Sequence, residues 1–391
     1  MMCRGFQAAG IRAGIKKNQA EDLGLIVSEV PTAVAGVFTR NKIKAAPVLL
    51  DMERVAAGTC RAVIVNSGNA NCCTGEQGME DAVRMARAAA QILGLPEDQV
   101  LVSSTGVIGQ YLPVEKIENA LPRLAAALSP SGFLDFAKAI MTTDTRSKML
   151  SRKVEIAGGS FSMIGIVKGA GMIRPDMATM LCYVCTDVEA DAAALKKLLT
   201  HAVDLSFNRI TIDGDTSTND TVLVLANGQS GLSIKDAPVK AAFQNALEVM
   251  LVDLAKMVVK DGEGVTKLVE IKVMGAATDA DAKKMADAVA HSNLVKTAFF
   301  GEDANWGRII GALGRAGAEL DPDAIDISFD DVCLVKNSRW QGIDAEADAT
   351  KVLKQPEFFV TIDAHIGSGT ASCWTCDFSI DYVKINADYR S

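Results

Sequence analysis

One threonine near the middle of the chain has the residue type and surroundings of a nucleophile. Thr179 follows a glycine-rich, proline-containing loop at residues 168–177 and begins an apolar, strand-like segment at residues 179–186. A threonine hydroxyl is a weak nucleophile unless a base lies beside it. If the chain is cut before Thr179, the freed α-amino group supplies that base, because its ordinary pKa of about 7.7–8 suits proton transfer near neutral pH. An N-terminal threonine nucleophile is therefore one hypothesis for this segment.

The same hydroxyl could make the cut. Thr179 Oγ would attack the carbonyl carbon of Ala178, move the acyl group from nitrogen to oxygen, and leave an ester for water to hydrolyse. Alanine before the bond leaves room for this attack. From the residues alone, a purely structural threonine at the start of a strand is the commoner alternative.

Other common catalytic motifs are poorly supported. The three histidines, His201, His291 and His365, have no serine elbow near them, which disfavours a Ser-His-Asp triad. The sequence contains no G-x-x-x-x-G-K-[ST] loop, and the glycines after Lys168 do not form G-x-G-x-x-G. Nucleotide binding is therefore not expected.

The nine cysteines include two C-x-x-C pairs, Cys182/Cys185 and Cys373/Cys376, both in strand-like segments. Residues three apart on a strand point to opposite faces, so neither pair can hold one ion without a turn. Nine cysteines in a chain of this length also do not make a disulfide framework. We predict structural thiols and no metal site.

The candidate residues lie at the ends of predicted strands, in a chain that alternates strands with helices. Such alternation favours α/β or α+β layers. Because one core rarely exceeds about 250–300 residues, 391 residues predict two lobes or two closely packed halves. Strands are expected at 23–27, 34–39, 62–66, 100–104, 153–156, 161–167, 179–186, 268–273, 324–329, 357–362 and 374–385, and helices at 80–93, 191–206, 239–260 and 279–292.

Composition and charge exclude several classes of function. With 49% hydrophobic and 23% charged residues the chain is globular rather than disordered. The net charge is −8 and no basic stripe occurs, which argues against nucleic acid; the nearest candidate, Lys16-Lys17, is interpreted as a solvated turn. No apolar run reaches about 18 residues and no signal segment is evident, so a cytoplasmic protein without membrane contact is expected.

The segment from Lys168 to Leu181, KGAGMIRPDMATML, closely resembles the processing site of the bifunctional ornithine acetyltransferase/N-acetylglutamate synthase family of arginine biosynthesis. The family pattern there is close to K-G-[SA]-G-M-I-x-P-[ND]-M-A-T-M-L. The resemblance covers the whole chain, in blocks at residues 5–11, 35–39, 66–71, 103–109, 141–145, 261–264, 303–308 and 385–391. So many blocks in the same order make chance a poor explanation.

The resemblance implies the roles of the site residues. Thr179 would be the nucleophile, Ala178–Thr179 the cleaved bond, and Thr105 and Gly106 the oxyanion hole, where losing one donor typically raises the barrier by roughly 3–4 kcal/mol. Without the resemblance, Thr105-Gly106 would be an ordinary turn after a strand. The family's substrate contacts fall on Thr142, Lys168, Thr179, Glu263, Asn386 and Ser391.

These residue types suit an amino-acid substrate, since Lys168 can bind a carboxylate and Glu263 an ammonium group. Thr143 or Thr145 could replace Thr142. The chain ends in serine where many relatives have threonine, which keeps the hydroxyl. We expect a strand at 374–385 to hold this tail in place.

The implied fold is α/β, an α+β sandwich of layered sheets and helices shared with self-processing aminopeptidases. Cleavage would give fragments 1–178 and 179–391, which would stay associated as a heterotetramer of two copies of each. The implied reaction moves acetyl from N2-acetylornithine to L-glutamate through an acetyl-threonine, without cofactor or metal. Whether acetyl-CoA is also a donor stays open.

Two alternatives remain at this point. A self-processing amidohydrolase or aminopeptidase would release acetate without needing glutamate. A binding protein that kept the fold without cleaving itself would run as one band on a denaturing gel.

Overall fold

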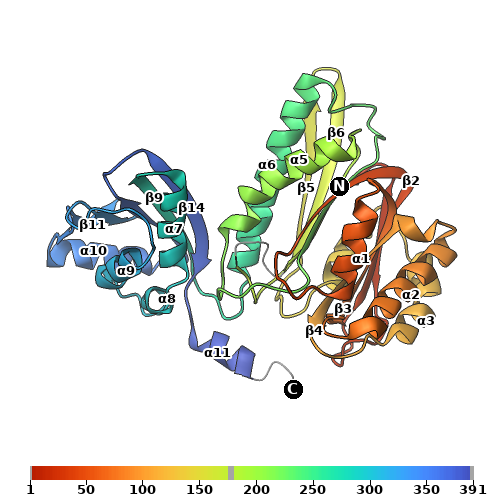
Figure 1. Cartoon of the computed structure of the whole chain (residues 1–391), viewed down its shortest axis with the longest axis horizontal. Coiled ribbons are helices and arrows are strands. Elements are labelled where there is room, and N and C mark those ends of the chain that lie inside the picture. The colour runs from red at the N-terminus through yellow and green to blue at the C-terminus, as the bar shows by residue number, and fades with distance from the viewer. Residues whose placement is uncertain (1, 175–179, 388–391) are drawn as a thin grey trace. The chain divides into compact units, whose positions relative to one another are not determined.

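The computed structural model describes residues 2–174 and 180–387, which form two compact units. The first unit contains residues up to 208 together with 215–258. The second contains residues 209–214 and those from 259 onward. Figure 1 labels the elements of both units along the chain.

An eight-stranded mixed sheet forms the centre of the first unit. β3 runs parallel to β4 and β7 parallel to β8, whereas the other neighbouring strands are antiparallel. Every residue of β7 and β8 is buried, as expected for strands covered on both faces. The order is β4 (Val100–Val107), β3 (Thr59–Asn69), β2 (Leu23–Phe38), β8 (Thr221–Ala226), β7 (Leu181–Thr186), β6 (Gly159–Lys168) and β5 (Lys148–Ile156), with β1 (Phe6–Ile11) paired to β2.

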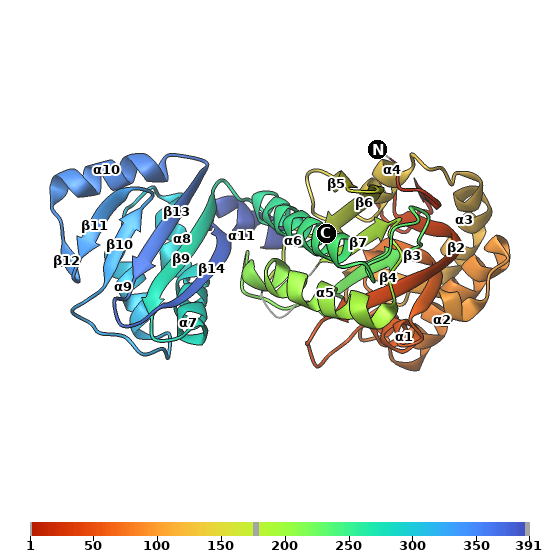
Figure 2. The ribbon, with the colours of Figure 1, turned by 90° about the horizontal axis from the view of Figure 1, so that it is seen from above.

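Helices cover this sheet. One apolar cluster joins α1 (Ala46–Val55), α2 (Gly75–Leu93) and α3 (Val114–Ala126) to strands β1–β4. A second apolar cluster joins α4 (Phe133–Ala139) to strands β1–β4 and β6–β8. Helices α5 (Ala192–Asp204) and α6 (Ala237–Lys260) lie side by side (Figure 2), and Gly165 of β6 leaves room for α6, since a Cβ there would lie 2.7 Å from Met250 Sδ.

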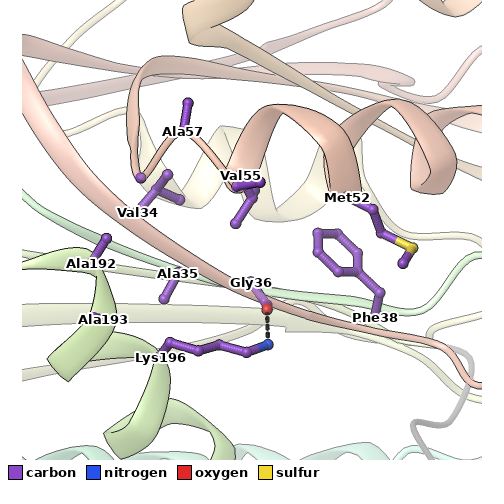
Figure 3. A pocket seen from close by; sticks show the side chains of 12 residues that line it. Val34, Ala35, Gly36, Phe38, Met52, Val55, Ala57, Ala192, Ala193 and Lys196 are labelled. Atoms are coloured by element: carbon purple, nitrogen blue, oxygen red, sulfur yellow. Dashed lines mark hydrogen bonds between the residues drawn. The ribbon is translucent and has the colours of Figure 1, made fainter.

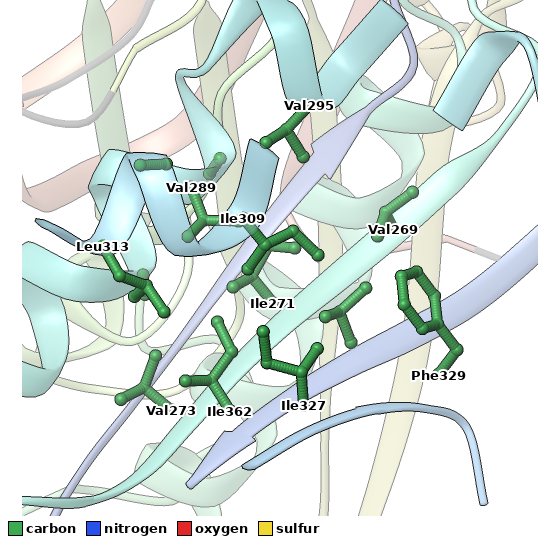
Figure 4. Packing of buried hydrophobic residues seen from close by; sticks show 14 of the residues in the cluster. Val269, Ile271, Val273, Val289, Val295, Ile309, Leu313, Ile327, Phe329 and Ile362 are labelled. Carbon is green, nitrogen blue, oxygen red and sulfur yellow. The ribbon is translucent and has the colours of Figure 1, made fainter. Parts of the chain in front are cut away.

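The second unit contains a six-stranded sheet packed against helices. Valine and isoleucine side chains of β9 and β13 point toward the helices in Figure 4, following the two-residue period of a strand. The strand order is β12 (Arg339–Trp340), β11 (Val332–Lys336), β10 (Asp326–Phe329), β13 (Glu357–Asp363), β9 (Leu268–Ala276) and β14 (Gly369–Cys376). The helices are α7 (Asp279–Ala290), α8 (Asn293–Phe300), α9 (Trp306–Gly314), α10 (Ile343–Leu353) and α11 (Ile380–Ala387).

The layered α/β arrangement predicted from the sequence is confirmed, and so are most of its elements. Two predictions need correction. The separate strands at 23–27 and 34–39 are one strand, β2, whose register against β3 shifts between Val27 and Thr32. The strand predicted at 374–385 is correct only for residues 374–376, because β14 ends at Cys376 and a helix begins at Ile380.

The helix α11 has a sequence signal that the strand prediction overlooked. Ser379 Oγ accepts a hydrogen bond from the backbone N–H of Tyr382, 3.3 Å away, and Asp381 lies in the first turn. A serine cap followed by an acidic residue favours the start of a helix. The tail is therefore helical from Ile380 to Ala387.

The predicted fragments 1–178 and 179–391 do not coincide with the two units. Strands β7 and β8 follow residue 179, yet they lie in the sheet between β2 and β6, which both precede it. A cut before residue 179 would thus leave one sheet built from both fragments.

Candidate active site

Lys168, at the end of β6, brings three predicted site residues together. Its Nζ donates to the hydroxyl oxygen of Thr142 at 2.7 Å and to that of Thr105 at 3.2 Å. The lysine side chain is only 3% exposed. This contact favours Thr142 among the three threonines that the sequence left open. On the neighbouring strand, Lys168 is paired with Leu181, two residues after the predicted nucleophile.

A buried carboxylate, Asp144, organises the same residues. Its Oδ1 accepts from Lys148 Nζ at 2.6 Å and from Gly169 N at 2.7 Å. Its Oδ2 accepts from Thr142 N at 2.9 Å and lies 4.0 Å from Lys168 Nζ. Burial alone would raise the pKa of Asp144, but the ammonium groups of Lys168 and Lys148 hold it well below its usual range.

The cluster gathers buried charged groups. Two ammonium groups, Lys148 and Lys168, lie near the carboxylate of Asp144, and all three side chains are at most 3% exposed. A lysine ammonium group can bind a carboxylate through charge-assisted hydrogen bonds. Lys168, which also contacts Thr105 and Thr142, is therefore suited to a substrate carboxylate.

The predicted oxyanion residues lie where β3 and β4 approach closely. Gly106 has a φ of +137°, and a Cβ there would lie 2.4 Å from the carbonyl carbon of Gly68. Only glycine fits this combination of backbone angle and contact. Thr105 is 4% exposed. The strand pairing thus fixes the backbone at the two residues predicted to stabilise an oxyanion.

The polar loop before β8 contains two residues that the sequence analysis missed. Asn219 Nδ2 donates to the carbonyl of Ser104 at 2.8 Å, and so holds the residue before Thr105. Asp220 Oδ1 accepts from Met180 N at 3.0 Å, while Met180 O accepts from Thr221 N at 3.1 Å. Burial raises the pKa of Asp220 well above its usual value.

A sequence signal for this loop existed. Residues 215–220, Asp-Thr-Ser-Thr-Asn-Asp, form an unbroken polar run directly before the apolar strand β8. The last four of these residues are buried. Buried polar groups require partners, so a polar run that leads into a core strand indicates a hydrogen-bonding role.

Three predicted site residues, Ala178, Thr179 and Ser391, lie outside the described residues. Two others belong to the second unit, where Asn386 Nδ2 donates to Glu263 Oε2 at 2.7 Å. Glu263 is 8% exposed. The two predicted substrate contacts of this unit therefore touch each other.

Lys16 corrects the interpretation of residues 16–17 as a solvated turn. Lys17 is exposed, but Lys16 is half-buried, and a Cβ on Gly68 would lie 3.0 Å from Lys16 Cγ. Burial lowers the pKa of Lys16 to about 8. Lys16 is therefore packed against the strand that adjoins Gly106.

The C-x-x-C cysteines lie on strands, as predicted. Cys182 and Cys185 belong to β7 and Cys373 and Cys376 to β14, and all four are buried. Burial raises the pKa of each thiol. Within residues 2–174 and 180–387, no three side chains of histidine, cysteine, aspartate or glutamate are grouped as a metal site would require.

A separate cavity of about 510 Å³ lies over β2, between α1 and α5 (Figure 3). Its lining is mostly apolar, with Val34, Phe38 and Val55 among the side chains. Lys196 reaches across it and donates to the carbonyl of Gly36. None of the predicted site residues that the structure describes lines this cavity.

The described part of the chain contains no helix that is both long and apolar enough to cross a membrane.

Comparison with known proteins gives matches over the full length of the chain. The sequence profile of the ArgJ family matches residues 7–391. The arginine biosynthesis bifunctional protein ArgJ of Geobacter sulfurreducens is 53% identical over 393 residues, covering 100% of both chains. The protein of the same name from Syntrophotalea carbinolica is 54% identical over 391 residues, covering 99% of each.

A crystal structure of arginine biosynthesis bifunctional protein ArgJ from Bacillus halodurans is also similar. It is 43% identical, with a TM-score of 0.51. The match covers 97% of that chain but only 52% of this one. The crystallised chain thus corresponds to about half of the present sequence.

Proposed function

Because the chain belongs to the ArgJ family of arginine-biosynthesis acetyltransferases, we propose that it transfers acetyl from N2-acetylornithine to L-glutamate through an acetyl ester on Thr179. One observation supports this most directly: Lys168 contacts Thr105 and Thr142 and is paired with Leu181. The proposed carboxylate-binding residue, oxyanion residue and strand after the nucleophile are thus close together.

The transfer proceeds by double displacement. The free amine of Thr179 accepts the hydroxyl proton, and Oγ attacks the acetyl carbonyl of N2-acetylornithine. Thr105 and Gly106 stabilise the negative oxygen of the tetrahedral intermediate. Ornithine leaves with the proton on its α-nitrogen, and the α-amine of glutamate then attacks the ester and regenerates Thr179.

The ammonium group of Lys168 fits both substrates. N2-acetylornithine and glutamate each carry an α-carboxylate next to the reacting nitrogen. Binding this carboxylate at Lys168 would place either nitrogen at the same position relative to Thr179. Lys168 is 3% and Thr105 4% exposed, so the carboxylate would be bound by groups that are themselves buried.

The remaining substrate contacts are proposed from the motifs. Glu263 would bind the side-chain ammonium of ornithine. Asn386, which donates to Glu263, would hold the Glu263 carboxylate in place. Ser391 would add a hydroxyl. Acetyl-CoA is a second possible donor, which the experiment below tests.

Self-cleavage at Ala178–Thr179 is part of the proposal. It supplies the amine that the mechanism needs as its base. The match of about half of this chain to nearly all of the Bacillus halodurans chain supports a division near the middle, as expected if that relative is also cut.

The decisive experiment is transfer of labelled acetyl to glutamate, with N2-acetylornithine and acetyl-CoA supplied in parallel. We expect labelled N-acetylglutamate from N2-acetylornithine, and an equal loss of acetyl from the donor. Release of labelled acetate at the same rate without glutamate would instead identify a hydrolase. Product from acetyl-CoA would establish the second donor.

We predict that fragments 1–178 and 179–391 stay together after cleavage, in a complex with two copies of each. The physical reason is that β7 and β8 of the second fragment lie between β2 and β6 of the first. Native mass spectrometry should show both fragments in one complex, which separates only at denaturant concentrations that unfold the sheet. Separation of folded fragments by salt or dilution would contradict this prediction.

Glu263→Gln should weaken binding of the acetyl donor while sparing the fold. Glutamine can still accept the hydrogen bond from Asn386, but it lacks the charge for an ammonium group. A hydrogen bond to a charged group is worth about 1.5–3 kcal/mol, so KM for N2-acetylornithine should rise roughly 10- to 150-fold. Steady-state kinetics would measure this, with Glu357→Gln on β13 as control. An unchanged KM would remove Glu263 from the proposed site.

A further inference from the structure

Asp220 is a buried carboxyl group with one oxygen left without a partner. It is fully buried at the start of β8, and its Oδ1 accepts the backbone N–H of Met180 at 3.0 Å. Its Oδ2 has no hydrogen-bond partner in the part of the chain that the structure describes. Buried polar atoms are nearly always paired, so an orphaned oxygen of this kind requires an explanation.

Its surroundings favour the protonated form of this carboxyl group. Burial raises its pKa well above the usual value, and this outweighs the opposite effects of Met180 N–H, Ser217 and the ammonium of Lys168. A carboxylic acid at neutral pH has a proton to donate, as few other side chains do. Asp220 therefore differs from Asp144, which the two lysines keep ionised.

Self-cleavage needs a proton donor that the mature mechanism does not supply. The free amine of Thr179 serves acetyl transfer, but before cleavage this nitrogen belongs to a peptide bond. When Thr179 Oγ attacks Ala178, the departing nitrogen must gain a proton, and Oγ must lose one. Another group has to carry that proton.

The covalent chain keeps the Thr179 nitrogen close to Asp220. Asp220 accepts a hydrogen bond from Met180 N, and Met180 N is the backbone nitrogen directly after that of Thr179. Standard bond lengths keep consecutive backbone nitrogens within about 4 Å of each other at any dihedral angle. Thr221 N, which donates to Met180 O, fixes this residue further. The carboxyl group thus cannot lie far from the bond that breaks.

We propose that Asp220 transfers the proton in self-cleavage, an inference that rests on the proposed cut before Thr179. Its carboxyl O–H donates a proton to the Thr179 nitrogen as the C–N bond breaks, and the carboxylate takes up the proton that Oγ releases. An ester joins Ala178 to Thr179 Oγ, and the acid is restored. Water then hydrolyses the ester to a carboxylate and a free hydroxyl.

Asp220→Asn tests this step, because asparagine keeps an acceptor for Met180 N–H but has no acidic proton. The uncut full-length chain would be followed by denaturing gel and intact-mass measurement after synthesis. We expect cleavage to be at least about 100-fold slower than in the wild type, the usual contribution of a positioned acid. Asp220→Glu, which keeps the acid, should cleave faster than Asp220→Asn.

Asp51→Asn is the matched control. Asp51 is also fully buried, accepts one backbone N–H, from Val102 at 2.8 Å, and has an orphaned Oδ2. Burial raises its pKa in the same direction. Asp51→Asn removes a buried carboxyl group that does not contact Met180. We therefore expect this variant to be cleaved at the wild-type rate. Circular dichroism would compare the folding of all the uncut chains.

Hydroxylamine at neutral pH separates a blocked acyl shift from slow ester hydrolysis, because it cleaves esters rapidly and peptide bonds slowly. In Asp220→Asn it should not release fragments. Release at the wild-type rate, or untreated cleavage of this variant within about threefold of wild type, would overturn the role of Asp220. If the wild-type chain itself is never cut before Thr179, the proposed function fails instead.

Discussion

Thr179→Ala is expected to yield one uncut chain of 41.3 kDa without acetyltransferase activity. The substitution removes the hydroxyl that attacks Ala178, and without the cut no free amine exists to act as base. Both activities depend on the same oxygen, so both should fall to the background of the assay. A denaturing gel and the labelled-acetyl assay measure the two losses independently.

Thr179→Ser is the control for that variant. Serine keeps the hydroxyl and, once the chain is cut, the amine, so cleavage and some transfer activity should persist. N-terminal sequencing of the wild-type second fragment should begin Thr-Met-Leu-Cys. A Thr179→Ala protein that is cut, or that still forms N-acetylglutamate, would contradict the mechanism.

The sequence predicted the elements whose signals are local. Helices α5, α6 and α7 lie within two residues of their predicted limits, because apolar residues recur with the helical period. The same approach failed at the tail, where Tyr382, Val383 and Ile385 suggested a strand. A capping serine at residue 379 and the local acidic charge produce a helix there instead.

Contacts between distant residues were not predictable from spacing. The motif resemblance indicated Lys168, Thr142 and Thr105 separately, but only the folded structure shows that one ammonium group contacts both hydroxyls. The polar run at 215–220 signals hydrogen bonding by Asp220, but the sequence does not reveal how the environments of Asp144 and Asp220 differ. The fold shifts their pKa values in opposite directions, since two lysines lower that of Asp144 and burial raises that of Asp220.

The sheet order is a second property that the sequence did not reveal. Strands β7 and β8 follow the proposed cleavage point but lie between strands that precede it. Adjacent strands in a sheet need not be adjacent in sequence, and hydrophobic patterns do not specify their partners. The association of the two fragments therefore follows from topology and not from the motif at residues 168–181.

Asp144→Asn should destabilise the protein strongly and impair substrate binding. The change removes the carboxylate that accepts from Lys148 and lies 4.0 Å from Lys168 Nζ, and it turns an amide N–H toward the donors Thr142 N and Gly169 N or toward a lysine. Breaking a buried ion pair by removing one partner typically costs about 3–5 kcal/mol. Denaturant unfolding at neutral pH would measure the loss, and acetyl-transfer kinetics would show a raised KM for both substrates.

The loss of unfolding free energy caused by Asp144→Asn should become smaller as the pH falls. The folded pKa of Asp144 lies below its ordinary value of 3.8, so the carboxylate stabilises the fold above about pH 4 and loses this contribution as the pH falls. The difference in unfolding free energy between wild type and Asp144→Asn should thus shrink below pH 4. A difference that stays constant down to pH 2 would mean that hydrogen-bond geometry, and not charge, causes the loss.

Adding Lys148→Met to Asp144→Asn tests whether the lost charge of Asp144 or its lost hydrogen bonds cause the effect. Lys148→Met in the Asp144→Asn background removes the buried ammonium group that donates to Asp144 Oδ1 in the wild type. Stability and substrate affinity should then partly recover, because the cluster loses one positive charge along with the negative charge of Asp144. Asp253→Asn, which breaks the half-exposed pair with Arg152, should cost only about 0–1 kcal/mol. If the double variant is less stable than Asp144→Asn alone, Lys148 stabilises the site by other contacts, and the lost charge of Asp144 does not explain the effect of Asp144→Asn.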